Sequence, residues 1–169
     1  MKLKEMEMFK YFVAVLMLLS LCKGCEAQHL VIKAPDDAYA CGFRIKTGVL
    51  TVAHLEGVGS VWVDRDLDLR LIESDAGRLF DIGRGKPKYF RCRRGVKHSL
   101  TVLRTEKKQW ICDREFFPGE SGLPVFNSKG QVVGLVLGNR VENVYRGRVC
   151  RILKNASVRA ATVDKDKKN

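Results

Sequence analysis

The sequence lacks any long segment in which apolar residues recur every 3.6 positions, and this absence excludes a helical fold for the body of the chain. It has no Cys-x-x-Cys pair outside Cys22–Cys25, so a zinc ribbon is excluded as well. The apolar run Tyr11–Cys22 has twelve residues, short of the about 20 that a membrane-spanning helix requires. Acidic residues are scarce too, because 19 Asp and Glu oppose 31 Lys and Arg and leave a net charge of +12.

Residues 1–27 are expected to be a targeting segment rather than part of the fold. Met1–Lys10 carries three lysines, the apolar run follows, and Cys25–Ala27 offers small residues for a cut after Ala27. This order is typical of a secretory signal peptide, and an uncleaved membrane anchor is the alternative. Either one predicts a protein of the secretory pathway, secreted or associated with a membrane.

Four cysteines follow this segment, and their state stays open. An even number of cysteines in an oxidising compartment could form two disulfides, with three ways of pairing them, and free buried thiols are the alternative. These cysteines are Cys41, Cys92, Cys112 and Cys150.

A basic segment, residues 84–108, contains ten Lys or Arg and one opposing acid, Glu106. Such a charge density could bind nucleic acid or an anionic membrane surface, and a solvated face of a basic protein is the alternative. The basic residues are Arg84, Lys86, Lys88, Arg91, Arg93, Arg94, Lys97, Arg104, Lys107 and Lys108.

The body of the chain is a succession of short strand-like runs separated by turn residues, which predicts an all-β barrel or sandwich. The loop Gly83–Pro87 divides it, so residues 28–83 and 84–154 would each form a barrel, and residues 155–169 a polar tail. A hairpin turn is expected at Asn127–Gly130, and a single helical turn after His54. The expected strands are Leu30–Lys33, Tyr39–Lys46, Val49–Val52, Ser60–Val63, Leu67–Ile72, Tyr89–Cys92, Ser99–Arg104, Gln109–Cys112, Leu123–Phe126, Gln131–Leu137 and Val144–Leu153.

The segment Pro118-Gly-Glu-Ser-Gly-Leu-Pro-Val-Phe126 has the composition of a nucleophile turn. A serine nucleophile needs a tight turn that exposes its hydroxyl and points backbone N–H groups at one place. Gly119 and Gly122 flank Ser121 and permit the backbone angles of such a turn. The N–H groups of Gly119 and Ser121 would then form an oxyanion hole. Taken alone, the segment could also be a plain turn.

A histidine and an aspartate upstream complete a predicted triad. Gly48–His54 is a buried strand that ends on a histidine, which suits a general base facing a cleft. The acid comes from Asp64–Ile72, where Asp68 begins an alternating apolar run and would orient the histidine. The alternatives for the acid are Asp66, Asp75 and Asp81.

The order His, Asp and then Ser within Gly-x-Ser-Gly resembles that of chymotrypsin-like serine proteases. Val49–His54 resembles the histidine strand of that family, and Asp66–Ile72 its aspartate strand. Gly119–Phe126, followed by Lys129–Gly138, resembles its nucleophile hairpin. The chain is most similar in look to compact viral members, namely the alphavirus capsid protease, the pestivirus and flavivirus nonstructural proteases and the arterivirus main protease. The likeness covers about Cys41–Leu153.

The resemblance implies two small antiparallel β-barrels with the active site in the cleft between them. It implies a serine endopeptidase that processes a viral polyprotein and needs no metal or cofactor. The strand residues Val136, Leu137 and Gly138 would hold the polypeptide substrate by adding its backbone as a strand. Gly138 and Gly147 would line the specificity pocket, and Glu115 would form its floor and favour Arg or Lys at the cleaved position.

Three features depart from the family pattern. Glu120 stands where aspartate is usual, Cys41 has no cysteine partner just after His54, and only thirteen residues separate His54 from Asp68. The short gap implies that the first barrel lacks a hairpin, and an activating partner chain could complete it. It also favours the alternative of an inactive protease-like module that binds nucleic acid or a membrane through the basic segment. A secreted host-type protease, with a glycosylation sequon at Asn155–Ser157, is the third hypothesis.

Overall fold

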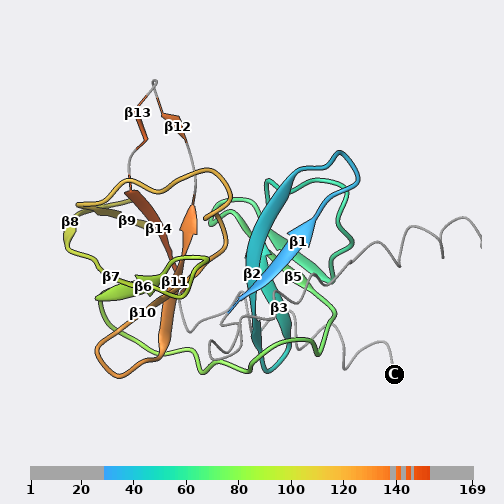
Figure 1. Cartoon of the computed structure of the whole chain (residues 1–169), viewed down its shortest axis with the longest axis horizontal. Helices are drawn as coiled ribbons and strands as arrows, with labels where there is room; N and C mark the ends of the chain where they lie inside the picture. The colour runs from blue at the N-terminus through green and yellow to red at the C-terminus, as the bar shows by residue number, and fades with distance from the viewer. Residues whose placement is uncertain (1–28, 138–139, 142–143, 146, 153–169) are drawn as a thin grey trace, which may run out of the picture.

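The computed structural model describes residues 29–137, 140–141, 144–145 and 147–152, which form fourteen strands and no helix (Figure 1). The all-β prediction is confirmed. Within these ranges no helix is long and apolar enough to cross a membrane. The predicted leader of residues 1–27, Gly138, and the tail with its sequon at Asn155–Ser157 lie outside the described residues.

The first sheet, on the right of Figure 1, has five antiparallel strands in the order β1-β2-β3-β5-β4. β3 lies at its centre and is buried at all five positions, because its Val and Leu side chains meet core on both faces. The strands are β1 Leu30–Lys33, β2 Tyr39–Ile45, β3 Gly48–Val52, β4 Trp62–Asp64 and β5 Leu69–Ile72.

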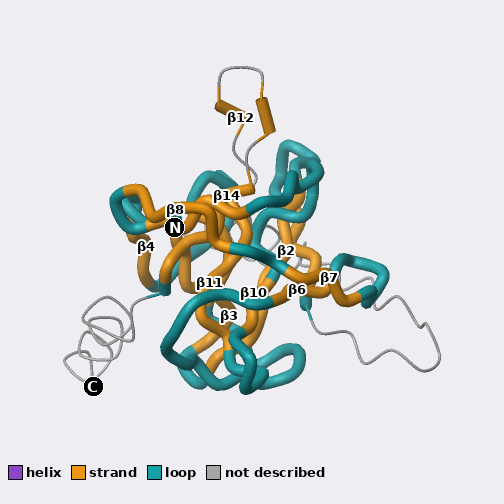
Figure 2. Tube along the Cα trace, turned by 90° about the vertical axis from the view of Figure 1, so that its left-hand side faces the viewer, coloured by secondary structure: helices purple, strands orange, loops and turns teal. Residues whose placement is uncertain are grey.

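The second sheet, on the left of Figure 1, has seven antiparallel strands in the order β7-β6-β10-β11-β14-β9-β8. A separate two-stranded hairpin, β12 and β13, stands away from both sheets in Figures 1 and 2. The strands are β6 Tyr89–Arg91, β7 Lys97–Ser99, β8 Val102–Glu106, β9 Gln109–Cys112, β10 Pro124–Phe126, β11 Val132–Leu137, β12 Arg140–Val141, β13 Val144–Tyr145 and β14 Gly147–Arg151.

One hydrophobic core joins the two sheets through the central strand β11. Leu135 and Leu137 pack into the same core as Phe43 and Leu50 of the first sheet. Their neighbours on the opposite face of β11, among them Val136, pack into a second core within the larger sheet. Because β11 is covered on both faces, its sequence is continuously apolar rather than alternating.

The segment between β5 and β6 bonds to both sheets. The Phe80 N–H donates to the Arg44 carbonyl (2.9 Å), and the Gly83 N–H donates to the Val132 carbonyl (2.8 Å). The Asp81 carbonyl accepts from the Val132 N–H (2.9 Å). The predicted boundary near residue 83 lies in this segment.

The backbone confirms one of the two predicted turns and contradicts the other. The hairpin turn at Asn127–Gly130 is confirmed, since the Asn127 side-chain oxygen accepts from the Lys129 and Gln131 N–H groups (2.9 and 3.0 Å). The helical turn expected after His54 is wrong, because residues 53–57 form non-helical turns and a bend. The segment Val144–Leu153, expected to be one strand, contains two strands in its described part, β13 and β14.

The expected strand Ser99–Arg104 is also two strands, because the chain changes partner there. The Leu100 N–H still donates to the Lys88 carbonyl, next to β6 (2.9 Å). The Thr101 N–H donates instead to the Asp113 carboxylate (2.9 Å), and β8 then pairs with β9. A break in pairing of this kind leaves no mark on the local pattern of apolar residues.

Candidate active site

His54 and Asp68 lie side by side at the ends of neighbouring strands β3 and β5. The His54 Nδ1 atom is 2.6 Å from Asp68 Oδ2, and the His54 backbone N–H donates to Asp68 Oδ1 (2.9 Å). With the proton on Nδ1, the tautomer that this contact favours, Nε2 keeps its lone pair. The Nε2 atom can then act as a general base, and the imidazole is 45% exposed to receive a proton.

The turns that carry this pair differ from the predicted strand ends. β3 ends at Val52, so His54 lies in the following turn rather than on the strand. Asp68 has a left-handed backbone (φ 54°), which aspartate tolerates better than most residues. The Asp64 carboxylate accepts the Leu67 N–H (3.0 Å) and fixes the turn that places Asp68.

The other aspartates that are alternatives for the catalytic acid do not bond to His54. Among the described residues, Asp68 is the carboxylate that bonds to His54. The alternatives, all exposed, are Asp66, Asp75 and Asp81. The gap of thirteen residues is therefore long enough for the contact between His54 and Asp68.

Arg70, which the sequence reasoning missed, holds the histidine turn. Its guanidinium donates to the Ala53 carbonyl (3.1 Å) and to the Val58 carbonyl. These bonds tie both ends of the turn around His54 to β5. The only sequence signal is an arginine between two buried leucines of a short strand, which is too common to point to a role.

Ser121 lies in a tight loop that is held by two hydrogen bonds between Glu120 and Phe117. The Phe117 N–H donates to the Glu120 carboxylate (2.9 Å), and the Glu120 N–H donates to the Phe117 carbonyl (3.0 Å). Gly119 and Gly122 have φ of 85° and 88°, angles that a residue with a side chain rarely adopts. Glu120 is thus a structural residue of this loop, buried together with Ser121.

Backbone contacts hold the serine loop against the first sheet. The Cys41 N–H of β2 donates to the Ser121 carbonyl (2.7 Å). The Thr51 hydroxyl of β3 donates to the Cys41 carbonyl (2.7 Å), one residue before β3 ends. Ser121 and His54 are therefore anchored to the adjacent strands β2 and β3. A side chain at Gly122 would bring its Cβ to 1.7 Å from the Cys41 carbonyl oxygen, so only glycine allows this approach.

The predicted oxyanion-hole residue Gly119 has a backbone N–H that bonds to no acceptor in the described part of the chain. The Gly119 carbonyl accepts from the Cys41 thiol, whose sulfur is 3.3 Å from it. Burial raises the pKa of the Cys41 thiol to about 12, so it stays a neutral donor at neutral pH. The oxyanion hole at Gly119 and Ser121 stays a prediction.

Of the residues predicted to hold the substrate backbone, Val136 is already bonded inside the protein. Its carbonyl accepts from the Gly122 N–H (2.8 Å), and its N–H donates to the Leu123 carbonyl (3.0 Å). Leu137 is the last described residue of β11, and Gly138 lies outside the described residues. Leu137 is paired with Arg148 of β14, so a role of Val136, Leu137 and Gly138 in holding the substrate backbone stays a prediction.

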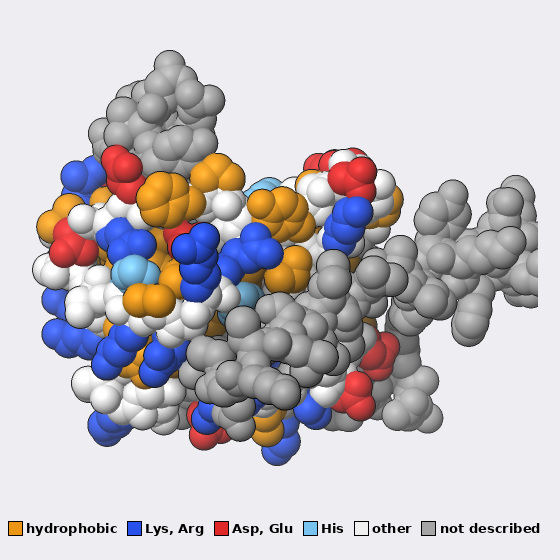
Figure 3. Space-filling view, in the orientation of Figure 1, with side chains coloured by type: hydrophobic (Ala, Val, Ile, Leu, Met, Phe, Trp, Pro, Cys, Tyr) orange, Lys and Arg blue, Asp and Glu red, His pale blue; other side chains and the backbone are white. Residues whose placement is uncertain are grey.

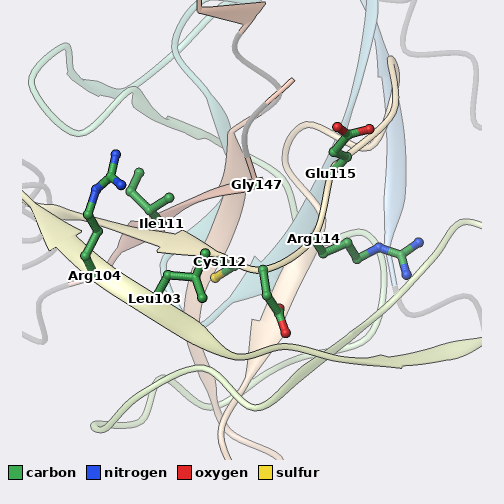
Figure 4. A pocket seen from close by; sticks show the side chains of 8 residues that line it. Leu103, Arg104, Ile111, Cys112, Arg114, Glu115 and Gly147 are labelled. Atoms are coloured by element: carbon green, nitrogen blue, oxygen red, sulfur yellow. The ribbon is translucent and has the colours of Figure 1, made fainter. Parts of the chain in front are cut away.

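Glu115 and Gly147 line one pocket of about 260 Å³ between β8, β9 and the loop after β9 (Figure 4). Gly147 has no room for a side chain, because a Cβ would lie 1.7 Å from the Arg114 carbonyl oxygen. The Arg114 side chain points away from the Leu103 and Arg104 side chains in Figure 4, and it bonds to His98 Nδ1 (2.9 Å). A role of Glu115 and Gly147 in specificity stays a prediction.

The described cysteines are free thiols, at positions 41, 92, 112 and 150. Within the same residues no group of three or more His, Cys, Asp or Glu could hold a metal ion.

Comparison by sequence matches the chain to no family model and to no curated protein. Comparison of structures matches it to serine proteases. The human astrovirus serine protease is 15% identical, with a TM-score of 0.59, over 77% of this chain and 92% of that chain. The active form of the M. tuberculosis protease Rv3671c is 17% identical, with a TM-score of 0.53, over 82% of this chain and 80% of that chain. An inactive form of Rv3671c is 15% identical, with a TM-score of 0.54, over 82% and 89%.

These likenesses establish the fold. The two antiparallel sheets have the chymotrypsin-like two-barrel arrangement, as the sequence predicted, and a viral protease is among the proteins that share it.

Proposed function

We propose that this chain is a serine endopeptidase that hydrolyses peptide bonds through Ser121, His54 and Asp68. The observation that carries the proposal is the double contact of Asp68 with His54, next to strands that anchor the Ser121 loop. The same order of residues in a chymotrypsin-like fold supports it.

The proposed reaction uses the three side chains in turn. Ser121 Oγ attacks the scissile carbonyl carbon while His54 Nε2 takes the hydroxyl proton, and Asp68 stabilises the imidazolium. Backbone N–H groups of the serine loop stabilise the oxyanion. The tetrahedral intermediate collapses, the amine leaves with the proton from His54, and an acyl-enzyme remains. Water, deprotonated by His54, then releases the acid product and restores Ser121.

The proposed substrates are polyprotein junctions, including those that flank the chain itself. The likeness to an astrovirus serine protease supports a viral setting. The leader predicted at residues 1–27 of this chain favours action in the secretory pathway, and an activating partner chain would add to the first sheet. Expression of the chain with its natural flanking sequences tests this. Processing in the wild type that is absent in Ser121→Ala is expected, and equal processing in both would contradict it.

The second candidate function is binding of an anionic macromolecule through the basic segment, as an inactive module. Nine of its ten Lys and Arg are exposed, and its one acid, Glu106, is paired with Arg104 (2.6 Å). Lys and Arg side chains gather over the larger sheet on the face shown in Figure 3. Steeply salt-dependent binding to RNA or to anionic vesicles, unchanged in Ser121→Ala and without peptide cleavage, would favour this function.

A further inference from the structure

A half-exposed tyrosine lies directly against the serine loop. Tyr39, the first residue of β2, is 47% exposed, although its ring touches Gly119. A Cβ added at Gly119 would lie 2.5 Å from the Tyr39 ring, so the ring covers the backbone next to the predicted oxyanion hole. An aromatic face left open beside a nucleophile is a surface on which a substrate residue can rest.

Arg93 extends this surface and gives it charge. Its guanidinium carbon lies 5.2 Å from the centre of the Tyr39 ring, in the range of a cation–π contact. The turn that carries Arg93, between β6 and β7, is braced by the Gly95 N–H to the Cys92 carbonyl (2.8 Å) and by Arg91 to the Gly95 carbonyl (3.1 Å). Arg93 therefore projects from a fixed hairpin rather than from a loose loop.

The charge of Arg93 has no acid partner among the described residues. The two acids closest to Tyr39 in sequence are used elsewhere. Asp36 accepts the Ala38 N–H (3.1 Å), and Asp37 pairs with Lys33 (2.6 Å). Burial lowers the pKa of His29, and the nearby charge of Arg93 lowers it further. The guanidinium is free to bind an incoming carboxylate.

The bonds on the two sides of the serine loop indicate which substrate residues would reach the surface formed by Tyr39 and Arg93. Gly122 bonds to Val136 of β11, the strand predicted to hold the residues before the cleaved bond. Ser121 bonds to β2 on the opposite side, through Cys41. The residues after the cleaved bond would therefore leave along β2, toward Tyr39.

We propose that Tyr39 and Arg93 form a subsite for an acidic side chain within the first three residues after the cleaved bond. The inference rests on the proposed peptidase function. It assigns the basic turn at Arg93 to recognition of the leaving peptide. The carboxylate binds the guanidinium, and the apolar part of the acidic side chain rests on the Tyr39 ring.

Matched peptides test the subsite. A peptide that the wild type cleaves is made with Glu, Gln or Lys at each of the three positions after the bond, and kcat/KM is measured. At one position we expect Glu to exceed Gln by about fivefold, as for a partly exposed ion pair, and to lose this advantage in high salt. Arg93→Glu is expected to reverse the order to Lys over Glu.

Arg94→Glu is the matched control, because Arg94 is exposed in the same turn and the charge change is identical. Of these two arginines, Arg93 is the one whose guanidinium lies over the Tyr39 ring. The Glu preference is expected to survive in Arg94→Glu. A preference that is absent in the wild type, unchanged in Arg93→Glu, or equally reversed by both variants would overturn the inference.

Binding of the same peptides to Ser121→Ala separates this inference from the proposed function, since binding needs no catalysis. Fluorescence anisotropy of labelled peptides should show the Glu preference, and Arg93→Glu in the Ser121→Ala background should abolish it. A Glu preference in binding without cleavage by the wild type would contradict the peptidase alone. Cleavage with no Glu preference in either assay would contradict the subsite alone.

Discussion

The two sheets hold their parts of the site in different ways. The first sheet carries His54 and Asp68 in turns beyond the strand ends, where local bonds from a carboxylate and from Arg70 fix them. The second sheet carries Ser121 in a buried loop that is held by Glu120 within the loop and by a contact with the other sheet, through Cys41. The base and acid therefore depend on bonds within one sheet, and the nucleophile depends in addition on how closely the two sheets approach.

This difference implies that the two parts can be disturbed separately. A change in the His54 or Asp68 side chain should remove catalysis and leave the fold intact. A change at the contact between the loop and β2 should weaken the fold itself, because one hydrophobic core spans both sheets.

Asp68→Asn should lower kcat/KM by about 10³–10⁴-fold, because an amide cannot hold the histidine tautomer or stabilise the imidazolium. Asp66→Asn is the control, since Asp66 is exposed in the same turn and makes no bond to His54. Steady-state kinetics on a cleaved peptide, with circular dichroism to confirm folding, measure both. Equal activity of the two variants would remove Asp68 from the site.

Gly122→Ala should destabilise the fold by several kcal/mol or prevent folding, since its Cβ would lie 1.7 Å from the Cys41 carbonyl oxygen. Gly130→Ala is the matched control. Gly130 also has a left-handed backbone (φ 73°), but its nearest neighbour, the Tyr89 hydroxyl, is 3.7 Å away. It should cost only about 1 kcal/mol of backbone strain. Urea unfolding of both variants measures the difference, and similar losses would contradict a specific contact between loop and β2.

Alkaline pH should weaken the fold through its buried thiols. Burial raises the pKa of Cys41 and of Cys112 to about 12, and raises that of Cys150 as well. An ordinary thiol in the unfolded chain ionises near pH 9, so the unfolded state loses protons first. The stability that these neutral thiols contribute is full below about pH 8.5 and falls as the pH rises toward 12.

Cys41→Ala isolates one of these thiols. Between pH 8 and pH 10 the free energy of unfolding of the Cys41→Ala variant should fall by about 1 kcal/mol less than that of the wild type. Denaturant unfolding at both pH values measures this, and parallel pH profiles would show that Cys41 ionises equally in both states. Lysine and tyrosine titrate alike in the two proteins and cancel in the difference.

Sequence reasoning succeeds here where the signal is local. The runs Leu30–Lys33 and Gln109–Cys112 are strands with the expected bounds, and Asn127–Gly130 forms the expected turn. Alternating or continuous apolar residues, ended by turn residues, carry that information in the segment itself. The candidates His54, Asp68 and Ser121 could be selected because their order and glycine flanks are also visible along the chain.

The parts that could not be predicted depend on distant partners. The break at Leu100 arises because the chain leaves β6 for β9. The choice of Asp68 among four aspartates depends on its contact with His54, which lies beyond the end of the neighbouring strand. The contacts of Tyr39 with Gly119 and Arg93 join segments about 80 and 54 residues apart, by the numbering, and no local pattern marks them.

Labelling with a fluorophosphonate tests the central claim most directly, because it needs an activated serine and no knowledge of the substrate. The attacking Ser121 oxygen displaces fluoride and remains bound to phosphorus, and mass spectrometry locates the label. The account predicts labelling of the wild type at Ser121 and none in Ser121→Ala or His54→Ala. A folded wild type that stays unlabelled, or one labelled equally in His54→Ala, would contradict it.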